Sequence, residues 1–549
     1  MNDTSLATTA APATSSPWAP FRQRVFTIMW FAMLVANMGT WMRDVGAGWL
    51  MTTLSPSATA VAMVQVATTL PIFLLSLPAG ALADIVDRRR LLIGINIALG
   101  LVAAALGVVT HAGAMTPVLL VLGLMCAGIG VALTQPVQQS LTPLLVERPL
   151  LRSAVALNSM GLNVSRAIGP ALGGVVVASL GVAATFYLDA LSYLAVIGAL
   201  WWWKGASAPA AAGTPEQIGA AMRAGLRYAW HAPALQRVLL RAGSFFIFAS
   251  AWWALLPIIA RRELGGGPGY YGVLLSCVGA GAVAGAILLP SLRARWSAET
   301  TLRGGLVATV LVLVLLAAVR EQVAAAAVMV LAGAAWIVVL TIANVTAQTQ
   351  LPNWVRGRGL ALYLSVFYGA MAAGSFLWGQ IADLAGVPMA LWGAAGLGGI
   401  ACLLAWRRPL PEGEPDLSPS GHWPLPVLAP EMAHRLDSEQ VDRDIGPVLI
   451  TVEYQVPPQG VAGFLRALHE FSPQRLRDGA WQWGGYEDLA RPGVFVEHFL
   501  VASWAEHQRQ HHRVSVADAD LQARVRAFHA GSEPPLVRHL LAAHPQTRP

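Results

Sequence analysis

The feature that most constrains this chain is a series of twelve apolar stretches, separated by short breaks, in its first 410 residues. A helix of about 20 apolar residues spans the roughly 30 Å hydrocarbon core of a bilayer. Because backbone in hydrocarbon must satisfy its own hydrogen bonds, stretches of this length cross as α-helices. The sequence therefore predicts an all-α membrane body whose helices lie near residues 24–50, 58–83, 91–111, 116–140, 153–180, 182–203, 234–260, 270–292, 300–319, 322–349, 359–383 and 387–406.

The charged residues support this interpretation and divide the chain in two. Only 12% of the 549 residues are charged, against about 25% in a typical soluble protein, which excludes a large soluble enzyme as the main body. Residues 1–410 contain 24 basic and 11 acidic residues, whereas residues 411–549 contain 12 and 18. We therefore expect a basic membrane body followed by an acidic, water-soluble C-terminal domain.

The longest break between apolar stretches separates the sixth predicted helix from the seventh, which gives two halves of six helices. This break begins with Ala, Pro and Gly residues and continues into a short surface helix near residues 218–230. The predicted organisation is a disordered leader (1–20), a first half (21–203), a cytoplasmic inter-half linker (204–232), a second half (233–408), a flexible linker (409–446) and a soluble α+β domain (447–545).

The arginine residues predict the orientation. Basic residues resist translocation and accumulate on the cytoplasmic side of a membrane. One set of alternate loops contains nineteen basic residues, whereas the opposite set contains only Arg261, Arg262 and Arg320. This places both termini and the C-terminal domain in the cytoplasm of a multi-pass inner-membrane protein. The basic charge is thus explained by topology, and we expect no nucleic-acid partner.

The two halves share a short internal similarity. A shift of 209 residues aligns the segment around Gln135 in the fourth predicted helix with the segment around Asn344 in the tenth. Duplicated halves around a midplane cavity are typical of alternating-access transporters, so Gln135 and Asn344 are candidate cavity residues. The alternative is that polar residues simply cluster near cytoplasmic helix ends.

A motif between the second and third predicted helices indicates a family. The segment from Gly80 to Arg90 reads Gly-Ala-Leu-Ala-Asp-Ile-Val-Asp-Arg-Arg-Arg and resembles the loop signature of the major facilitator superfamily, although Ile85 and Asp87 depart from it. The resemblance implies that Gly80 permits close helix contact and that Asp84 meets a helix N-terminus or an arginine. It implies that Arg88, Arg89 and Arg90 hold cytoplasmic helix ends together. The alternative is a plain basic turn.

A second motif lies in the fifth predicted helix. Arg166 precedes Gly169-Pro170-Ala171-Leu172-Gly173-Gly174, which resembles the antiporter motif of the same superfamily. In that family the motif accompanies export in exchange for protons, and its small residues permit close helix packing. The alternative is ordinary glycine-mediated packing.

Two further segments narrow the resemblance. Residues 37–50, which begin with Asn37, and residues 69–73 are similar to the branch that contains enterobactin exporters and the transmembrane secretion effector group. The resemblance covers roughly residues 21–530. It implies the major facilitator fold and a secondary active transporter without a cofactor, and it does not identify the substrate.

Charged residues inside the predicted helices are candidates for function, because ionised groups are costly in a membrane unless they are paired or hydrated. A low-dielectric cavity favours the protonated form of a carboxyl group, so Asp44 is the first candidate for coupling proton uptake to substrate release. The alternative is that Asp44 lies at a wet outer end of the helix, paired with Arg43. Arg43 and Asp44 are about 100° apart on a helix, so at least one of them should face the cavity. Asp189 is the second proton-coupling candidate, and the alternative is that it caps a helix or forms a hydrogen bond between helices. Arg166 is either its structural partner or a contact for an anionic substrate.

The tryptophan residues allow two interpretations. Several lie within predicted helices and are candidates for lining an apolar cavity, namely Trp41, Trp49, Trp252, Trp253, Trp336 and Trp378. More often such residues form the interfacial belt of a membrane protein, to which Trp201, Trp202 and Trp203 are assigned.

The C-terminal domain has the pattern of a small α+β fold. Strands are predicted at 448–456, 480–486 and 494–501, helices at 460–477 and 516–529, and a last strand near Leu536. This order resembles a ferredoxin-like domain of the small dimeric α+β-barrel kind, whose relatives include antibiotic-biosynthesis monooxygenases. His507 and His511 share a helix face next to His512, but no further ligand has convincing spacing, so we predict a solvated helix face and no metal.

Together these patterns predict a proton-coupled exporter of small amphipathic molecules, such as drugs or siderophore-like compounds, working in the lipid bilayer by alternating access. One alternative is an importer of the same fold. Another is a membrane-tethered enzyme or sensor with an active monooxygenase-like domain. The C-terminal domain is a candidate for dimerisation, ligand sensing or docking of a protein partner.

Overall fold

The computed structural model describes residues 16–85, 87–203, 218–411, 413, 415–420 and 445–542. Most of the predicted leader and parts of both predicted linkers lie outside these residues. The described chain divides into two compact units. Of the described residues, the first unit contains those within 1–213, 243–341 and 365–407, and the second contains those within 214–242, 342–364 and 408–549.

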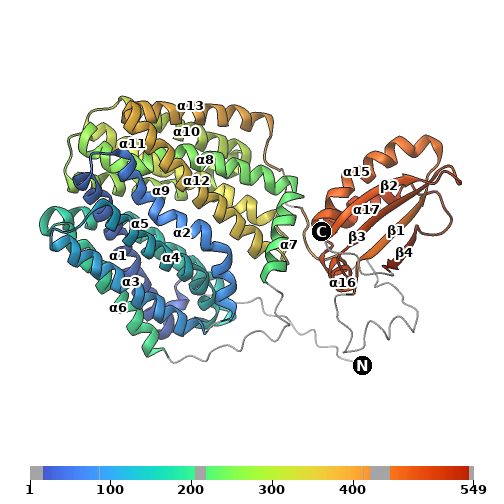
Figure 1. The fold of residues 1–549 in the computed structure, drawn as a ribbon, viewed down its shortest axis with the longest axis horizontal. Helices are drawn as coiled ribbons and strands as arrows, with labels where there is room; N and C mark the ends of the chain where they lie inside the picture. The colour runs from blue at the N-terminus through green and yellow to red at the C-terminus, as the bar shows by residue number, and fades with distance from the viewer. Residues whose placement is uncertain are drawn as a thin grey trace, which may run out of the picture. The chain divides into compact units, whose positions relative to one another are not determined.

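Twelve helices among the described residues are long and apolar enough to cross a membrane, which confirms the predicted number of spans (Figure 1). They are α1 (Arg24–Leu54), α2 (Ala58–Ile85), α3 (Arg88–His111), α4 (Pro117–Leu145), α5 (Leu151–Leu180), α6 (Val182–Trp202), α8 (Pro233–Ile258, extended by a π-helical turn at Ile259–Glu263), α9 (Pro268–Arg295), α10 (Ala298–Ala318), α11 (Gln322–Thr349), α12 (Arg356–Ala385) and α13 (Val387–Arg407).

The ends of these helices follow from local chemistry. The side chain of Thr116 accepts a hydrogen bond from the backbone N–H of Leu119 and caps α4, with proline in its first turn. Ser297 caps α10 in the same way. Gly181 and Gly386 have positive φ angles of 83° and 89°, so they permit the sharp turns between α5 and α6 and between α12 and α13.

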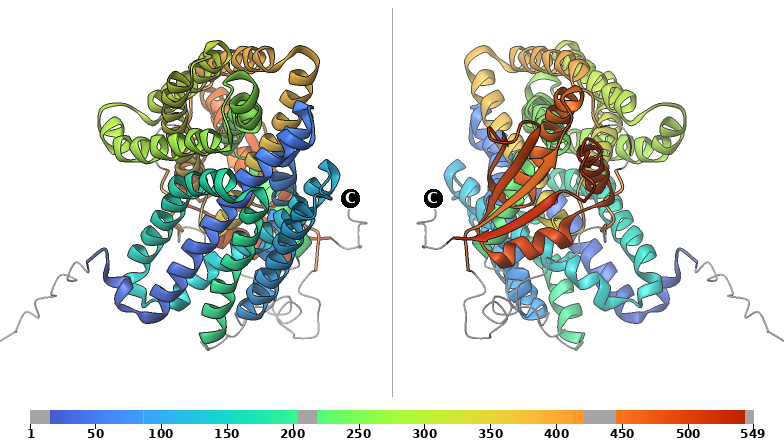
Figure 2. Two further views of the ribbon diagram at one scale, coloured as in Figure 1. Left: turned by 90° about the vertical axis from the view of Figure 1, so that its left-hand side faces the viewer. Right: turned by 90° about the vertical axis from the view of Figure 1, so that its right-hand side faces the viewer.

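The first unit is held together by helix packing. Within the first half, α1 packs against α5 and α6, α3 against α4 and α6, and α2 against α4. Buried apolar side chains, among them Phe26, Met29, Leu141 and Leu200, form a core there. In the second half α10 packs on α13, and α5 packs along α9 to join the two halves. Figure 2 shows the helices of this unit from two further directions.

The second unit contains α7 (Ile218–Trp230), as predicted for the linker, and a four-stranded antiparallel sheet of order β2-β3-β1-β4. Its strands are β1 (Val448–Gln455), β2 (Ala480–Glu487), β3 (Val494–Val501) and β4 (Leu536–Leu541), and its helices are α15 (Val461–Asp478), α16 (Trp504–Arg513) and α17 (Val516–Arg526). Alternate residues of β1 and β3 are buried in a core that includes Tyr454, Phe464 and Phe499. The strand order and the helix positions are those of a ferredoxin-like domain (Figure 1).

The prediction of a solvated histidine face on α16 is wrong. His507 is only 2% exposed, and its ring packs between those of Trp504 and His539, with centroids 5.4 and 4.8 Å away. Burial, followed by the neighbouring charges of His511 and His539, lowers the pKa of His507 to about 3, so this imidazole is neutral. The prediction failed because β4 supplies His539 from a distant part of the sequence. The side chain of His512 lies outside the described residues.

Candidate functional site

A cluster of charged side chains is buried between α1 and α6. Arg43 lies between two carboxylates: its Nη2 is 3.0 Å from Oδ1 of Asp44, and its Nη1 is 3.1 Å from Oδ2 of Asp189. Nη1 also donates to the hydroxyl of Tyr193 at 3.4 Å. The side chains of Arg43 and Asp189 are 3% and 0% exposed, whereas that of Asp44 is 36% exposed.

Two glycines bring α1 close enough to α6 for this contact. A Cβ atom added at Gly39 would lie 2.4 Å from Oγ of Ser192, and one added at Gly46 would lie 2.1 Å from Oγ1 of Thr185. Residues 39, 43 and 46 follow the helical i, i+4, i+7 spacing, so they share one face of α1. The guanidinium of Arg43 therefore reaches α6 directly.

Asp44 lies on a different face of α1, the one that meets the second half. Trp41, one turn earlier, packs on Trp253 of α8 with a centroid distance of 6.4 Å. A Cβ added at Gly48, one turn later, would lie 3.0 Å from the hydroxyl of Tyr271 in α9. Asp44 thus stands where the halves meet, while Arg43 connects it to the interior of the first half.

The cluster has two acids for one base. With both carboxylates ionised it carries a net charge of −1, and one bound proton makes it neutral. Among the described residues, Oδ1 of Asp189 is buried without a hydrogen-bond partner. Such an unsatisfied acceptor is costly in a membrane interior, so the arrangement is chemically suited to binding a proton.

Arg166 is separate from this cluster. Asp189 pairs with Arg43, so the interpretation of Arg166 as the partner of Asp189 is wrong. Arg166 is half-buried on α5 and interacts electrostatically with Tyr368 of α12, whose hydroxyl is hydrogen-bonded to Gln135 of α4. In the part of the chain that the structure describes, no carboxylate pairs with Arg166.

The glycines of the motif in α5 face two neighbours. Cβ atoms at Gly169 and Gly173 would lie 2.7 Å from Cβ of Trp41 and 3.0 Å from Cα of Met42, both in α1. A Cβ at Gly174 would instead lie 2.8 Å from Cα of Gly272 in α9. Pro170 lies in the same stretch of α5. The motif therefore sits where α5 contacts both α1 and the second half.

A carboxylate that we did not predict joins the halves near the start of α2. Asp383, near the end of α12, accepts hydrogen bonds from the hydroxyl of Ser57 at 2.6 Å and from the backbone N–H groups of Ala58 and Thr59. A negative charge at a helix N-terminus is stabilised by the unpaired N–H groups and the helix dipole. Arg261 lies at the same end and donates to Oγ1 of Thr52 at 3.1 Å.

The loop signature spans the end of α2 and the start of α3, so it lies at the other end of α2 from the contacts of Asp383. Asp87, which departs from the family pattern, caps α3 by accepting from the N–H of Arg90 at 2.9 Å. Arg89 donates to the carbonyl of Leu200 at 2.7 Å and so ties α3 to the end of α6. Arg88 is half-buried at the start of α3. The surroundings of Gly80 and the side chain of Asp84 are not among the parts of the chain that the structure describes.

The other predicted cavity residues are spread along the body. Asn37 is half-buried on α1, and Asn344 on α11 accepts a hydrogen bond from Gln348 one turn away. Trp253 and Trp336 stack at 5.4 Å within an aromatic cluster of α8, α11 and α12 that also includes Trp252. Trp201 and Trp202 are 70% and 49% exposed. No group of three His, Cys, Asp or Glu side chains among the described residues is arranged to hold a metal.

Known proteins resemble stretches of the chain that range from 29% to 71% of its length. It is 25% identical to a multidrug efflux pump, Tap, of Mycolicibacterium fortuitum, over 65% of this chain and 89% of that protein. It is 32% identical to a staphyloferrin A transporter of Staphylococcus aureus, over 29% of this chain and only 41% of that relative. The fold matches the crystal structure of a bacterial homologue of the human lysosomal transporter Spinster in an inward-facing, unoccupied conformation. The TM-score is 0.55 at 15% sequence identity, and the match covers 71% of this chain and 97% of that one.

A family profile matches almost the whole chain, from residue 15 to residue 547, and its description is transmembrane secretion effector. The match includes the C-terminal domain as well as the twelve spans. The alternative that the chain is a membrane-tethered enzyme is therefore rejected. The chain belongs to the transmembrane secretion effector family of the major facilitator superfamily, and it is a multi-pass membrane transporter.

Proposed function

We propose that this transporter exports small amphipathic molecules, such as drugs or siderophore-like compounds, in exchange for protons. The observation that carries the proposal is the cluster in which Asp44 and Asp189 share the guanidinium of Arg43 inside the membrane body. The relatives support the export of small molecules, since one is named as a multidrug efflux pump and another as a staphyloferrin A transporter.

In the proposed cycle Asp44 exchanges the proton, because its side chain is the accessible one and faces the second half. When Asp44 is protonated, Arg43 pairs with Asp189 alone and the cluster is neutral. When the proton leaves, the cluster carries net negative charge, and burying it between closing halves costs more free energy. Proton binding and closure of the halves are coupled in this way, as alternating access requires.

The orientation expected from the arginine residues places both termini and the C-terminal domain in the cytoplasm. The contacts of Asp383 and Arg261 then lie at the outer ends of the helices, where they hold the halves together. This supports a state that is closed to the outside. An importer of the same fold would close in the same way, so the proposed direction of transport rests on the relatives and on the motif in α5.

Substitution of Asp44 by Asn is expected to remove proton coupling. In inside-out vesicles with an imposed proton gradient and a pH-sensitive dye, addition of apolar cations such as ethidium, or of siderophores, should release protons from wild-type vesicles. Asp44→Asn keeps the shape of the side chain but cannot ionise, so we expect release to fall at least tenfold. Each factor of ten in a rate is about 1.4 kcal/mol of barrier.

The matched control is Asp520→Asn, which removes an exposed carboxylate from α17 and should leave release unchanged. If Asp44→Asn releases protons like the wild type, export stands but Asp44 is not the coupling residue. If no compound releases protons from wild-type vesicles while a labelled compound still accumulates, transport is not coupled to protons.

A further inference from the structure

Arg166 is a cation at the middle of a transmembrane helix that has no acidic partner among the described residues. It is the sixteenth residue of the 30-residue helix α5, so it lies near mid-depth. Its side chain is half-buried in the membrane body. A membrane-embedded cation of this kind marks a functional site by default.

Groups from both halves of the body lie close to Arg166. A Cβ added at Gly279 of α9, in the second half, would lie 3.0 Å from the carbonyl oxygen of Arg166 in α5. Gln135 lies on α4 of the first half, and Tyr368, its hydrogen-bond partner, lies on α12 of the second half. Tyr368 also interacts electrostatically with Arg166. Three polar groups with hydrogen-bond donors thus lie at the interface that opens and closes during transport.

We propose that Arg166, Gln135 and Tyr368 form the subsite that binds an anionic group of the transported molecule, such as a carboxylate. A guanidinium offers two parallel N–H donors that match the two oxygens of a carboxylate. The amide of Gln135 and the hydroxyl of Tyr368 supply further donors. Arg43 is not available for this role, because both of its edges are occupied by Asp44 and Asp189. The proposal rests on the proposed function for the statement that this ligand is transported.

The test uses two probes, dansyl-leucine and its methyl ester, which differ in the charge of the carboxylate and by one methyl group. Binding to the purified full-length transporter in nanodiscs is followed by dansyl fluorescence. We expect the wild type to bind the free carboxylate at least tenfold more tightly than the ester, and Arg166→Gln to abolish the difference. Arg166→Lys keeps the positive charge but lacks the two parallel N–H donors of the guanidinium, so it should retain part of the preference for the carboxylate.

The control is Arg320→Gln, because Arg320 is 48% exposed and its ion pair with Glu263 spans 3.6 Å. It should bind both probes like the wild type. Equal affinity of the wild type for the two probes, or a preference that survives in Arg166→Gln, would overturn the anion subsite. Failure of proton release with an intact carboxylate preference would instead overturn only the proton-coupled function.

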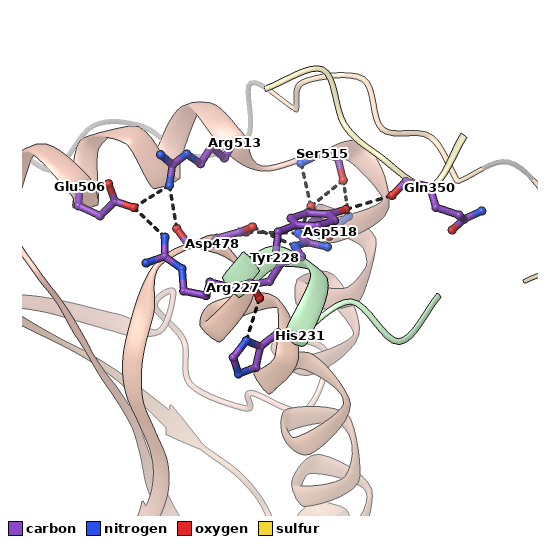
Figure 3. Close-up of polar contacts among 10 residues, drawn as sticks. Arg227, Tyr228, His231, Gln350, Asp478, Glu506, Arg513, Ser515 and Asp518 are labelled. Atoms are coloured by element: carbon purple, nitrogen blue, oxygen red, sulfur yellow. Dashed lines mark hydrogen bonds and ion pairs between the residues drawn. The ribbon is translucent and has the colours of Figure 1, made fainter. Parts of the chain in front are cut away.

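A second, independent observation concerns the C-terminal domain, which contacts α7 through a shared carboxylate. Oε1 of Glu506 lies 3.1 Å from Nη2 of Arg227 in α7 and 2.7 Å from Nη1 of Arg513 (Figure 3). Nη1 of Arg513 also donates to the carbonyl of Asp478 at 3.1 Å. The side chain of Glu506 is only 13% exposed. The linker helix is thus bound to α16 by a largely buried ion pair.

Aromatic residues extend this contact to the junction of α11 and α12. The guanidinium of Arg477 lies 5.2 Å from the ring centroid of Tyr228, and that of Arg513 lies 4.5 Å from the ring centroid of Trp354. The hydroxyl of Tyr228 donates to the carbonyl of Gln350 at 3.1 Å (Figure 3). The contact therefore includes both connecting segments that belong to the second unit.

The ion pair is not a pH switch. Burial opposes the ionisation of Glu506, but the guanidinium groups of Arg513 and Arg227 outweigh it and hold the pKa of Glu506 below its ordinary value. A lowered carboxyl pKa gives stability that is present above the ordinary pKa and lost only as the pH falls through the lowered one. The contact is accordingly intact at neutral and mildly acidic pH.

We also infer that the C-terminal domain is a clamp within the chain that restrains α7 and the α11–α12 junction during transport. These segments lead directly into α8, α11 and α12, whose ends must move when the halves rock. A domain that binds both segments makes those ends move as one body. The binding partners of the C-terminal domain at this surface are thus other segments of the same chain.

The variant Arg227→Glu tests the clamp from the side of α7 and leaves the pair of Glu506 with Arg513 in place. We expect hydrogen–deuterium exchange of α7 in the full-length protein to rise at least tenfold, and the rate of substrate-driven proton release to change at least threefold. Arg223→Glu is the control, because Arg223 is exposed on the same helix. Unchanged exchange in α7, or faster exchange without any change in transport, would contradict the clamp.

Discussion

Arg43→Gln is expected to abolish transport and to destabilise the membrane body by about 3–5 kcal/mol, the usual cost of removing one partner of a buried ion pair. The side chain of Arg43 is 3% exposed and contacts two carboxylates, one of which is completely buried. Glutamine cannot neutralise either carboxylate. Without the guanidinium, the two acids would face each other inside the membrane and would bind protons too tightly to release them.

Thermal unfolding of the purified protein and substrate-driven proton release measure the two effects separately. The double variant Arg43→Gln/Asp189→Asn removes the buried charge along with its partner, so we expect it to recover most of the lost stability and none of the transport. Arg320→Gln, which breaks an exposed ion pair, should change the unfolding temperature little. A single Arg43→Gln variant with wild-type stability and transport would show that the cluster is neither structural nor functional.

The helices of this protein could be predicted from the sequence because their cause is local. Runs of about 20 apolar residues have one stable form in hydrocarbon, and that form needs no knowledge of the neighbours. The same reasoning applies to β1 and β3 of the C-terminal domain, whose alternating residues follow the two faces of a sheet. These elements were predicted within a few residues of their observed bounds.

The partners of the charged residues could not be predicted in the same way. Asp189 lies 146 residues after Arg43, and only the close packing of α1 on α6 brings them together. Asp383 reaches the start of α2 across 324 to 326 residues of chain. In both cases the sequence identifies a costly charge but not the group that compensates it, because the compensation depends on which helices are neighbours.

The motif in α5 shows the same limit. Its glycines indicate close packing, and the sequence does not tell which helix is approached by which glycine. The structure separates them, with Gly169 and Gly173 against α1 and Gly174 against α9. Since α9 belongs to the second half, Gly174 is the position where a larger side chain should affect the contact between the halves.

Gly174→Val is expected to reduce transport at least tenfold. Carbon atoms in contact prefer about 3.5–4.0 Å, but the added Cβ would lie 2.8 Å from Cα of Gly272, and backbone cannot rotate out of the way as a side chain can. The helices α5 and α9 must then separate by about 1 Å or more, which disfavours the state in which the halves meet here. Overpacking of this kind costs about 1–3 kcal/mol. Gly174→Ala, with one added carbon, should show a weaker form of the same defect.

A disulfide bond can report this separation directly. A Cβ added at Gly269 would lie 4.0 Å from Cβ of Ala178, within the range of about 3.5–4.5 Å that a disulfide requires. With Cys126, Cys277 and Cys402 replaced by alanine, the pair Ala178→Cys/Gly269→Cys should cross-link readily, and adding Gly174→Val should suppress the cross-link. Gly198→Val is the matched control, because a Cβ at Gly198 in α6 meets no atom within 4 Å. Normal cross-linking together with normal transport in Gly174→Val would mean that the α5–α9 contact yields at little cost and does not govern the approach of the two halves.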